Sequence, residues 1–153
     1  MFFVATVILM GVNEYFAIIE QIGVYGFRIP GIALSFLLLL SFYFDGLDSI
    51  RWFKKGFAIL SDEIEDQILA DGGNYERSPM YHCIFLEDLL DLINFSKITL
   101  SADADKVIEL LSPFIQPMLF WMNVMTHPNG NIPCFNDSAN NVTTSPELLM
   151  FYI

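Results

Sequence analysis

The sequence predicts an all-α protein, and three observations support this prediction. Apolar residues recur at spacings of three and four in three separate stretches, which is the period of an amphipathic helix. No stretch shows the sustained alternation of apolar and polar residues that is typical of a half-buried strand. Helix-ending and helix-starting residues separate the three stretches. The predicted helices cover residues 48–70, 79–94 and 102–125.

The first predicted helix begins at Asp48 or Ser49, since either side chain can cap the free amides of the first turn. Its apolar stripe consists of Ile50, Phe53, Phe57, Leu60, Ile64 and Ile68. An acidic cluster near its end consists of Asp62, Glu63, Glu65 and Asp66. We interpret this cluster as a solvated helix face and not as a metal site. The sequence predicts neither a bound metal nor a cofactor.

The second predicted helix begins with a capping serine, Ser78, followed by Pro79, whose missing amide costs nothing in a first turn. The third contains Pro113 and Pro117, and each removes an amide donor and crowds the preceding turn. We therefore expect a kink or a short break in the third helix. Residues 126–145 form a long polar loop, and such loops are often functional. A further helix is expected to begin after this loop.

Two apolar runs lie near the N-terminus, Met1–Val12 and Ile29–Phe44. The first lacks a preceding basic region and a small-residue cleavage pattern, so it does not look like a secretory signal peptide. The second is shorter than the roughly 20 residues that a membrane span needs. We interpret it as a buried helix and expect no membrane association. The sequence assigns no cellular location.

The composition is strongly apolar and acidic. Of 153 residues 54% are hydrophobic, and 18 acids against 7 bases give a formal net charge of −11. This charge argues against nucleic acid as a partner. Any anionic ligand would need a locally basic surface on such a chain. The two cysteines, Cys83 and Cys134, make no disulfide framework and are expected to be free thiols.

A dense polar string separates the first two helices and reads D-G-G-N-Y-E-R-S-P-M-Y-H over residues 71–82. Gly72 and Gly73 permit the left-handed backbone that often ends a helix. Tyr81 and His82 follow in the first turn of the next helix, near the positive end of its dipole. A tyrosine and a histidine in this place are candidates for proton transfer.

A second polar string reads H-P-N-G-N-I-P-C-F-N-D-S over residues 127–138. The two strings, in this order, resemble those of the heparinase II/III-like polysaccharide lyases, which typically carry D-G-G-H-F-E-R-S-P-M-Y-H and H-P-D-G-x-I-P-x-F-N-D-S. The resemblance runs from about Phe44 to Glu147 and is strongest over residues 48–147. It implies an (α/α) toroid built of antiparallel helical hairpins, followed in the family by a β-sandwich domain.

The resemblance also implies a reaction and a partner. Such enzymes cleave acidic polysaccharides that contain uronic acid, heparin/heparan-like or alginate-like, by β-elimination. Tyr81 is similar in position to the family's tyrosine and is the predicted catalytic residue, assisted by Arg77 or by the helix N-terminus. The predicted substrate-binding residues are Arg77, Glu76, His82, His127, Asn136 and Asp137.

Several of these residues have a plain structural alternative. His82 either lines a cleft or is structural. Glu76 and Arg77 either contact sugar or form a local salt bridge. Asn136 and Asp137 either contact substrate or form a turn, since both residue types favour turns.

The chain also departs from the family pattern. Asn74 and Tyr75 stand where the family usually has His and Phe. The family's Asn-His pair, whose asparagine faces the substrate carboxylate, has no counterpart around Phe27–Ile32. Carboxylate neutralisation supplies a large electrostatic contribution to such reactions. We therefore expect residues 1–153 to be a fragment of one toroid domain, without the sandwich, and inactive alone.

A partial toroid would leave apolar faces exposed, so we expect self-association. Two other classes of protein stay open. One is a non-catalytic helical domain that binds a glycan or a protein. The other is a small membrane-associated protein that uses the two N-terminal apolar runs.

In antiparallel hairpins, alternate connections come to the same end of the helices. The connection at residues 71–78 and the loop at residues 126–145 should therefore be neighbours. We expect Tyr81, His82 and Arg77 to face a common cleft with residues 127–138.

Overall fold

The computed structural model describes residues 38–152, and this part of the chain is all-α, as predicted. A short helical segment at residues 38–43 precedes α3. The helices are α3 (Leu47–Gln67), α4 (Pro79–Thr99), α5 (Ala102–Met125) and α6 (Pro146–Met150). An isolated bridge joins Ile68 to Asn74, and the described residues contain no strand. The predictions for Met1–Val12, for most of Ile29–Phe44 and for Phe27–Ile32 lie outside the described residues.

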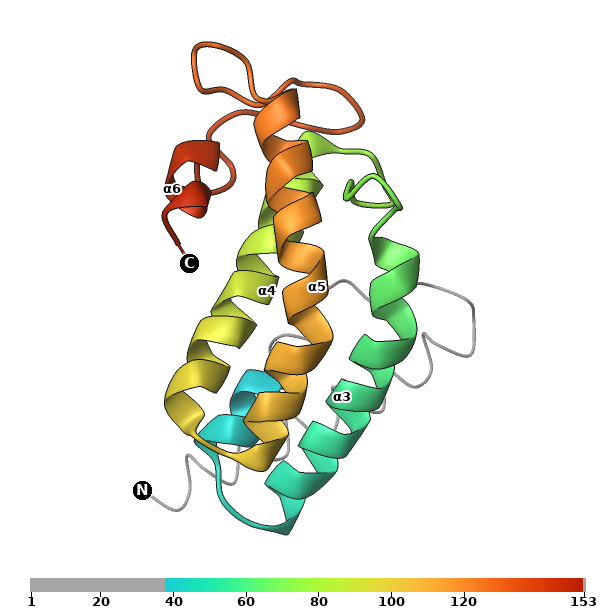
Figure 1. Cartoon of the computed structure of the whole chain (residues 1–153), viewed down its shortest axis with the longest axis vertical. Coiled ribbons are helices and arrows are strands. Elements are labelled where there is room, and N and C mark those ends of the chain that lie inside the picture. Colours follow the sequence, from blue (N-terminus) through green and yellow to red (C-terminus); the bar gives the residue numbers. More distant parts are fainter. Residues whose placement is uncertain (1–37, 153) are drawn as a thin grey trace.

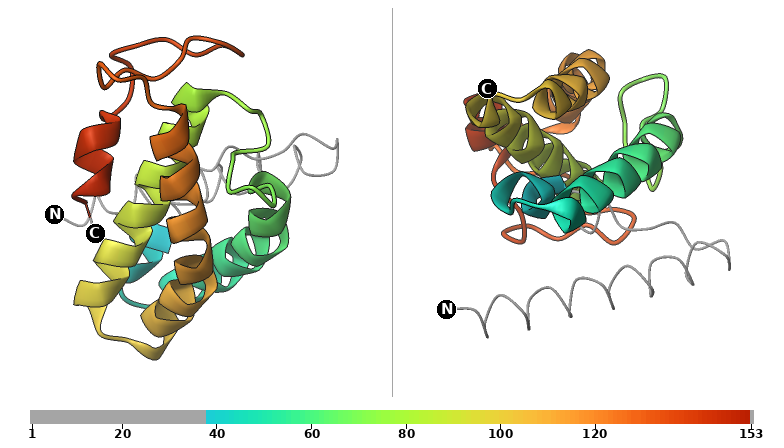
Figure 2. Two further views of the ribbon diagram at one scale, coloured as in Figure 1. Left: turned by 45° about the horizontal axis from the view of Figure 1, so that its top comes forward. Right: turned by 90° about the horizontal axis from the view of Figure 1, so that it is seen from below.

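Helices α4 and α5 form an antiparallel hairpin with the most extensive packing in the described chain. α3 lies alongside this hairpin, and α6 packs against both α4 and α5 (Figures 1 and 2). The core lies mainly between α4 and α5 and includes Leu86, Leu89, Leu92, Val107, Leu111 and Met118, none of which has exposed surface. This hairpin agrees with the predicted antiparallel pairing, and its place in part of an (α/α) toroid stays a prediction.

Two helix boundaries differ from those predicted. α4 continues to Thr99 instead of ending near Asn94, because Phe95 stacks on Phe42 and Ser96 is buried. Only two residues then separate α4 from α5. α3 is capped by neither Asp48 nor Ser49, since Gly46 takes the N-cap position.

Of the predicted kink or short break in α5, the break does not occur, because the helix runs through both prolines. The kink stays a prediction. Pro113 and Pro117 deprive the carbonyls of Glu109 and Pro113 of their amide partners. Glu109, Pro113 and Pro117 are exposed, so water can reach the two carbonyls. The prolines therefore lie on the side of α5 where the lost hydrogen bonds cost least.

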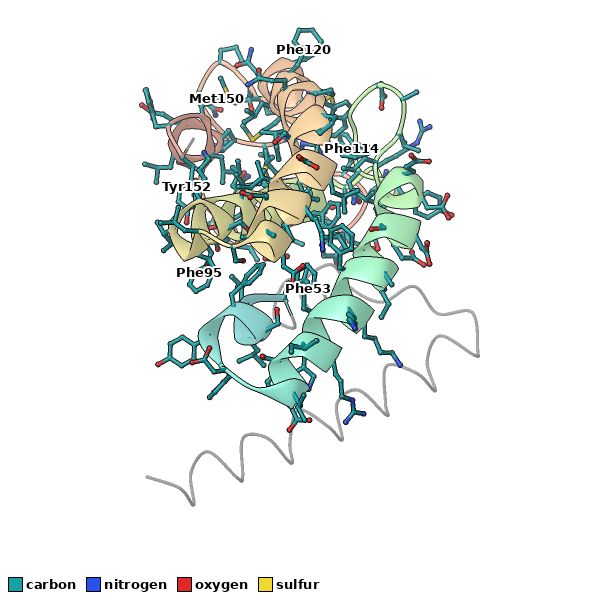
Figure 3. The ribbon with its side chains drawn as sticks, turned by 60° about the horizontal axis from the view of Figure 1, so that its bottom comes forward. Phe53, Phe95, Phe114, Phe120, Met150 and Tyr152 are labelled. Atoms are coloured by element: carbon teal, nitrogen blue, oxygen red, sulfur yellow. The ribbon has the colours of Figure 1, made fainter. Side chains whose placement is uncertain are left out.

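The outer face of α5 also carries large apolar side chains. Phe120 is 68% exposed and Val124 is 62% exposed, and Phe120 points away from the helices in Figure 3. Among the described helices, α5 is long and apolar enough to cross a membrane. Core helices of soluble proteins meet the same criterion. Self-association through such a face stays a prediction.

Two connections meet at one end of the α4–α5 hairpin. The segment from α3 to α4 and the loop after α5 both lie at the top of Figure 1. The first of these packs tightly on α5, because Gly72 and Gly73 leave no room for a side chain. A Cβ atom added at Gly72 would collide with the Pro117 carbonyl, and one added at Gly73 would lie 2.6 Å from Nε1 of Trp121. The two glycines thus let the first string lie directly on α5.

Gly72→Ala should destabilise the fold much more than Gly130→Ala. Both glycines have left-handed backbones, with φ of 86° and 82°, so both substitutions carry a penalty of about 1–2 kcal/mol. A Cβ at Gly130 meets nothing within 4 Å, whereas one at Gly72 adds about 1–3 kcal/mol of overpacking. Urea unfolding of the two variants measures the difference. Equal losses of stability would show that the close approach to Pro117 is not a constraint.

Candidate functional site

The first string is organised around the buried side chain of Asn74, which is only 4% exposed. The Asn74 Oδ1 accepts the Glu76 amide at 3.1 Å, and its carbonyl accepts the Arg77 amide at 2.9 Å. Its Nδ2 donates to the Gln67 carbonyl at 3.4 Å. These bonds fold residues 67–77 into a compact turn ahead of α4.

His82 joins this turn to α5. The Asn74 amide donates to Nδ1 of His82 at 3.2 Å, so the ring proton resides on Nε2, which donates to the Met118 carbonyl at 3.0 Å. The ring also packs on Trp121, with 4.5 Å between ring centroids. Burial lowers the pKa of His82 to about 4, although the Met118 carbonyl and Asp71 act in the opposite direction.

His82 is thus a neutral, fully buried side chain whose two nitrogens are both occupied by the backbone. Of its two predicted roles, the structural one agrees with the structure. No part of the imidazole reaches the surface in this structure, and the predicted contact between His82 and substrate stays a prediction.

The first amides of α4 are all satisfied within the protein. The Tyr81 amide donates to Ser78 Oγ at 3.3 Å, and the Met80 amide donates to Ser138 Oγ at 3.0 Å. Pro79 has no amide hydrogen, and the His82 amide donates to the Ser78 carbonyl. This helix N-terminus therefore presents no unused amide to an anionic ligand.

The two strings meet at this end of α4, which confirms that they are neighbours. Ser78 Oγ and Ser138 Oγ lie 2.9 Å apart, and Asn136 Nδ2 donates to the Arg77 carbonyl at 3.1 Å. Arg77, Asn136 and Asp137 all have left-handed backbones, with φ of 53°, 47° and 65°. Non-glycine residues adopt this conformation rarely, and it is enriched at functional sites.

The exposed residues at this junction are those that a ligand can reach. Tyr81 is 39% exposed in the first turn of α4, and Glu76, Arg77 and Asp137 are also exposed. The predicted salt bridge between Glu76 and Arg77 is absent from the described residues, where Arg77 forms no ion pair. A cleft shared by these residues stays a prediction.

His127 is exposed within a separate turn of the second string. Its amide donates to the Asn131 carbonyl at 2.9 Å, and its carbonyl accepts the Gly130 amide at 2.8 Å. No hydrogen bond within residues 38–152 joins His127 to the first string. The predicted substrate contact of His127 therefore stays a prediction.

Three residues that build this junction were not identified from the sequence. Asn74 stood out only as a departure from the family string, and nothing in the sequence indicated that its amide is buried. Trp121 lies within an apolar helix, so its packing on His82 left no signal. Ser138 ends the second string. A serine beside a turn can cap a helix, and this was the one indication that the sequence offered. Within the described residues, no cluster of three or more His, Cys, Asp or Glu side chains could hold a metal ion.

The described residues thus place both strings, which resemble those of polysaccharide lyases, at one end of a helical hairpin. The chain belongs to the heparinase II/III family, because residues 43–148 match the family described as the heparinase II/III N-terminus. This match confirms the family to which the two strings pointed.

Three curated relatives are each called heparin-sulfate lyase. The protein of Pedobacter heparinus is 31% identical over 94 residues, which are 60% of this chain and 14% of the relative. The protein of Bacteroides thetaiotaomicron is 30% identical over 99 residues, 58% of this chain and 13% of the relative. The protein of Bacteroides stercoris is 27% identical over 112 residues, 73% of this chain and 16% of the relative. The chain thus matches about a seventh of each relative's length. No solved structure matches it significantly.

The buried His82 should make the protein less stable in acid. Its pKa is about 4 in the folded state and about 6.5 when unfolded, so the unfolded chain binds the proton first as pH falls. The His82 contribution is therefore intact above pH 6.5 and is lost towards pH 4, a loss of about 3 kcal/mol in unfolding free energy. Urea unfolding at pH 7 and pH 4.5 measures this, and His82→Gln should show a smaller loss than the wild type.

Asp88 opposes this effect and serves as the control. Burial, together with Asp91 and Glu87, raises the pKa of Asp88 to about 6, so its carboxyl stabilises the fold as pH falls through the same window. Because Asp88 is partly exposed, solvent screening reduces its contribution. Asp88→Asn should steepen the acid loss and His82→Gln should flatten it. The same pH dependence in all three proteins would contradict the assignment.

Proposed function

We propose that this chain forms part of the catalytic and substrate-binding surface of a lyase that cleaves uronic-acid polysaccharide by β-elimination. One observation carries the proposal: two lyase-type strings meet at one end of α4, beside an exposed phenol and an exposed cation. The relatives, all called heparin-sulfate lyase, favour a heparan-like polymer over an alginate-like one.

In this proposal Tyr81 is the residue that transfers protons. β-Elimination breaks the C5–H bond, forms a double bond between C4 and C5, and breaks the C4–O bond to the leaving sugar. The C5 proton goes to a base, and the leaving oxygen takes up a proton. Tyr81 is suited to such a transfer because its ring is exposed while its backbone is fixed in the first turn of α4.

Arg77 is the residue that we propose to bind the anionic groups of the polymer. Its guanidinium can hold a carboxylate or a sulfate through two parallel hydrogen bonds. The α4 N-terminus cannot take this role, because its first amides are already bonded to Ser78 and Ser138. Arg77 thus offers a positive charge at the junction on a chain whose formal net charge is −11.

Binding without elimination is what we expect of this chain alone, since the family's Asn-His pair, whose asparagine faces the substrate carboxylate, has no counterpart around Phe27–Ile32. This expectation keeps the second candidate open, a non-catalytic helical domain that binds glycans. The exposed Arg77 and Tyr81 would serve binding equally well in such a domain. Elimination by a longer protein that contains this segment separates the two candidates.

Arg77→Gln should weaken binding of a heparan sulfate tetrasaccharide about tenfold, as expected when a hydrogen-bonded charge is removed. Lys97→Gln is the matched control, because it removes the same charge from the exposed last turn of α4, at the other end of the helix. Isothermal titration calorimetry at low salt measures both, with an alginate tetrasaccharide for comparison. Equal weakening in the two variants would mean that only net charge matters and that Arg77 is no specific contact.

Tyr81→Phe should abolish elimination, lowering the rate about 10²-fold or more, because a positioned acid or base contributes at least that much. The assay uses a chimaera in which residues 43–148 replace the matching segment of the Pedobacter heparinus relative. Ultraviolet absorbance of the unsaturated uronate product reports the rate. Tyr43→Phe, at an exposed tyrosine outside both strings, is the control. An active Tyr81→Phe chimaera would remove Tyr81 from catalysis.

A further inference from the structure

We propose that Asn136 and Ser138 are positioning residues, which hold Arg77 and Tyr81 in place and do not bind the polysaccharide themselves. This inference rests on the proposed function of Arg77 and Tyr81. It replaces the predicted substrate contact of Asn136 with a contact to the protein backbone, and it gives a role to Ser138, which had none.

Ser138 completes the N-terminal cap of α4. A single serine normally caps a helix by accepting one amide, and Ser78 Oγ does this for the Tyr81 amide. The Met80 amide would then lack a partner, but Ser138 Oγ lies 3.0 Å from it. The two serine hydroxyls are also hydrogen-bonded to each other. The first turn of α4, which carries Tyr81, is thus held by a hydroxyl from a residue about 60 positions away.

Asn136 holds Arg77 in a strained conformation. A left-handed backbone at a residue such as arginine costs about 1–2 kcal/mol, so it persists only when neighbouring groups enforce it. At Arg77 two bonds do so, because Asn74 accepts the Arg77 amide and Asn136 donates to the Arg77 carbonyl. Asn136 is itself left-handed, a conformation that asparagine tolerates better than most residues. Asparagine therefore suits position 136 through both its backbone and its side-chain donor.

These two contacts fix the backbone on both sides of the proposed binding surface. Arg77 directly precedes Ser78, and Tyr81 follows within the next turn. If Asn136 released the Arg77 carbonyl, Arg77 could relax to an ordinary backbone, and its guanidinium would point elsewhere. Loss of the second string should therefore weaken ligand binding while leaving the α4–α5 core intact.

The first test compares Asn136→Gly with Asn141→Gly in the full chain. Both asparagines are exposed, lie in the same loop and have left-handed backbones, and neither substitution changes charge. Only Asn136 donates to Arg77. We expect Asn136→Gly to weaken heparan sulfate tetrasaccharide binding about five- to tenfold, as expected for one lost hydrogen bond with its positioning effect, and Asn141→Gly to leave it unchanged.

Amide NMR signals of the ligand-free protein separate positioning from direct contact. Under our inference, Asn136→Gly shifts the Arg77 and Ser78 signals without any ligand present. If Asn136 instead touched the polysaccharide, affinity would fall while those signals stayed in place, and the inference would be wrong. Equal weakening by the two glycine variants would overturn it as well.

The second test uses Ser138→Ala and the conservative Ser138→Thr. We expect the Met80 amide to exchange with solvent about five- to tenfold faster in Ser138→Ala, as when a helix cap is lost, and to recover in Ser138→Thr. The ring signals of Tyr81, assigned with Tyr81→Phe, should move in the alanine variant and return with threonine. A purely structural role would lower the unfolding midpoint and leave the Tyr81 ring signals and the affinity of the folded protein unchanged.

Failure of the proposed function and failure of this inference give different results. If wild-type protein binds no uronic-acid oligosaccharide while the Arg77, Met80 and Tyr81 signals respond as expected, Asn136 and Ser138 hold their positions without the proposed ligand. If wild-type protein binds the oligosaccharide and neither variant differs from its control, the positioning inference is wrong and the proposed function stands.

Discussion

The described part of this molecule depends on one buried imidazole. His82 accepts the Asn74 amide and donates to the Met118 carbonyl, so a single neutral ring ties the first string to both helices of the hairpin. A charged ring could not do this, because protonated Nδ1 would no longer accept a hydrogen bond. The close contacts of Gly72 and Gly73 with α5 lie beside this arrangement, since the two glycines directly precede Asn74.

The charge at the N-terminal end of α4 differs from what the net charge of the chain suggests. The chain is strongly acidic, and the N-terminus of α4, the obvious place for an anion, is already occupied by two serine hydroxyls. What remains at the junction is Arg77, exposed and without an ion pair among the described residues. Recognition of an anionic polymer would then depend on one positioned guanidinium and not on a broad basic surface.

Much of the helical framework could be predicted from sequence, because apolar spacing records which face of each helix is buried. The meeting of the two strings could also be predicted, since it follows from the antiparallel order of helices. The extension of α4 could not, because it depends on Phe95 meeting Phe42 across the fold. Nor could the hydrogen bonds of His82 and Asn136 to backbone groups, since polar residues in a family string look alike whether they face ligand or backbone. The continuity of α5 through Pro113 and Pro117 was missed because exposure, which makes the prolines tolerable, is not visible locally.

The shared cap of α4 has a consequence for how this protein opens. The α4–α5 hairpin is closed by a two-residue connection and by a continuous apolar core, so it is the most cooperative part of the described chain. The loop that brings Ser138 to Met80 buries Ile132 in the core, and its contacts with the first string are hydrogen bonds. Such a loop can detach at a lower free energy than global unfolding. The Ser138 hydroxyl, one of the two that cap α4, then leaves with it. Order at the junction and stability of the fold are therefore separate quantities. Mild denaturant would remove the ordered contact between the two strings while circular dichroism still reported an intact helical protein.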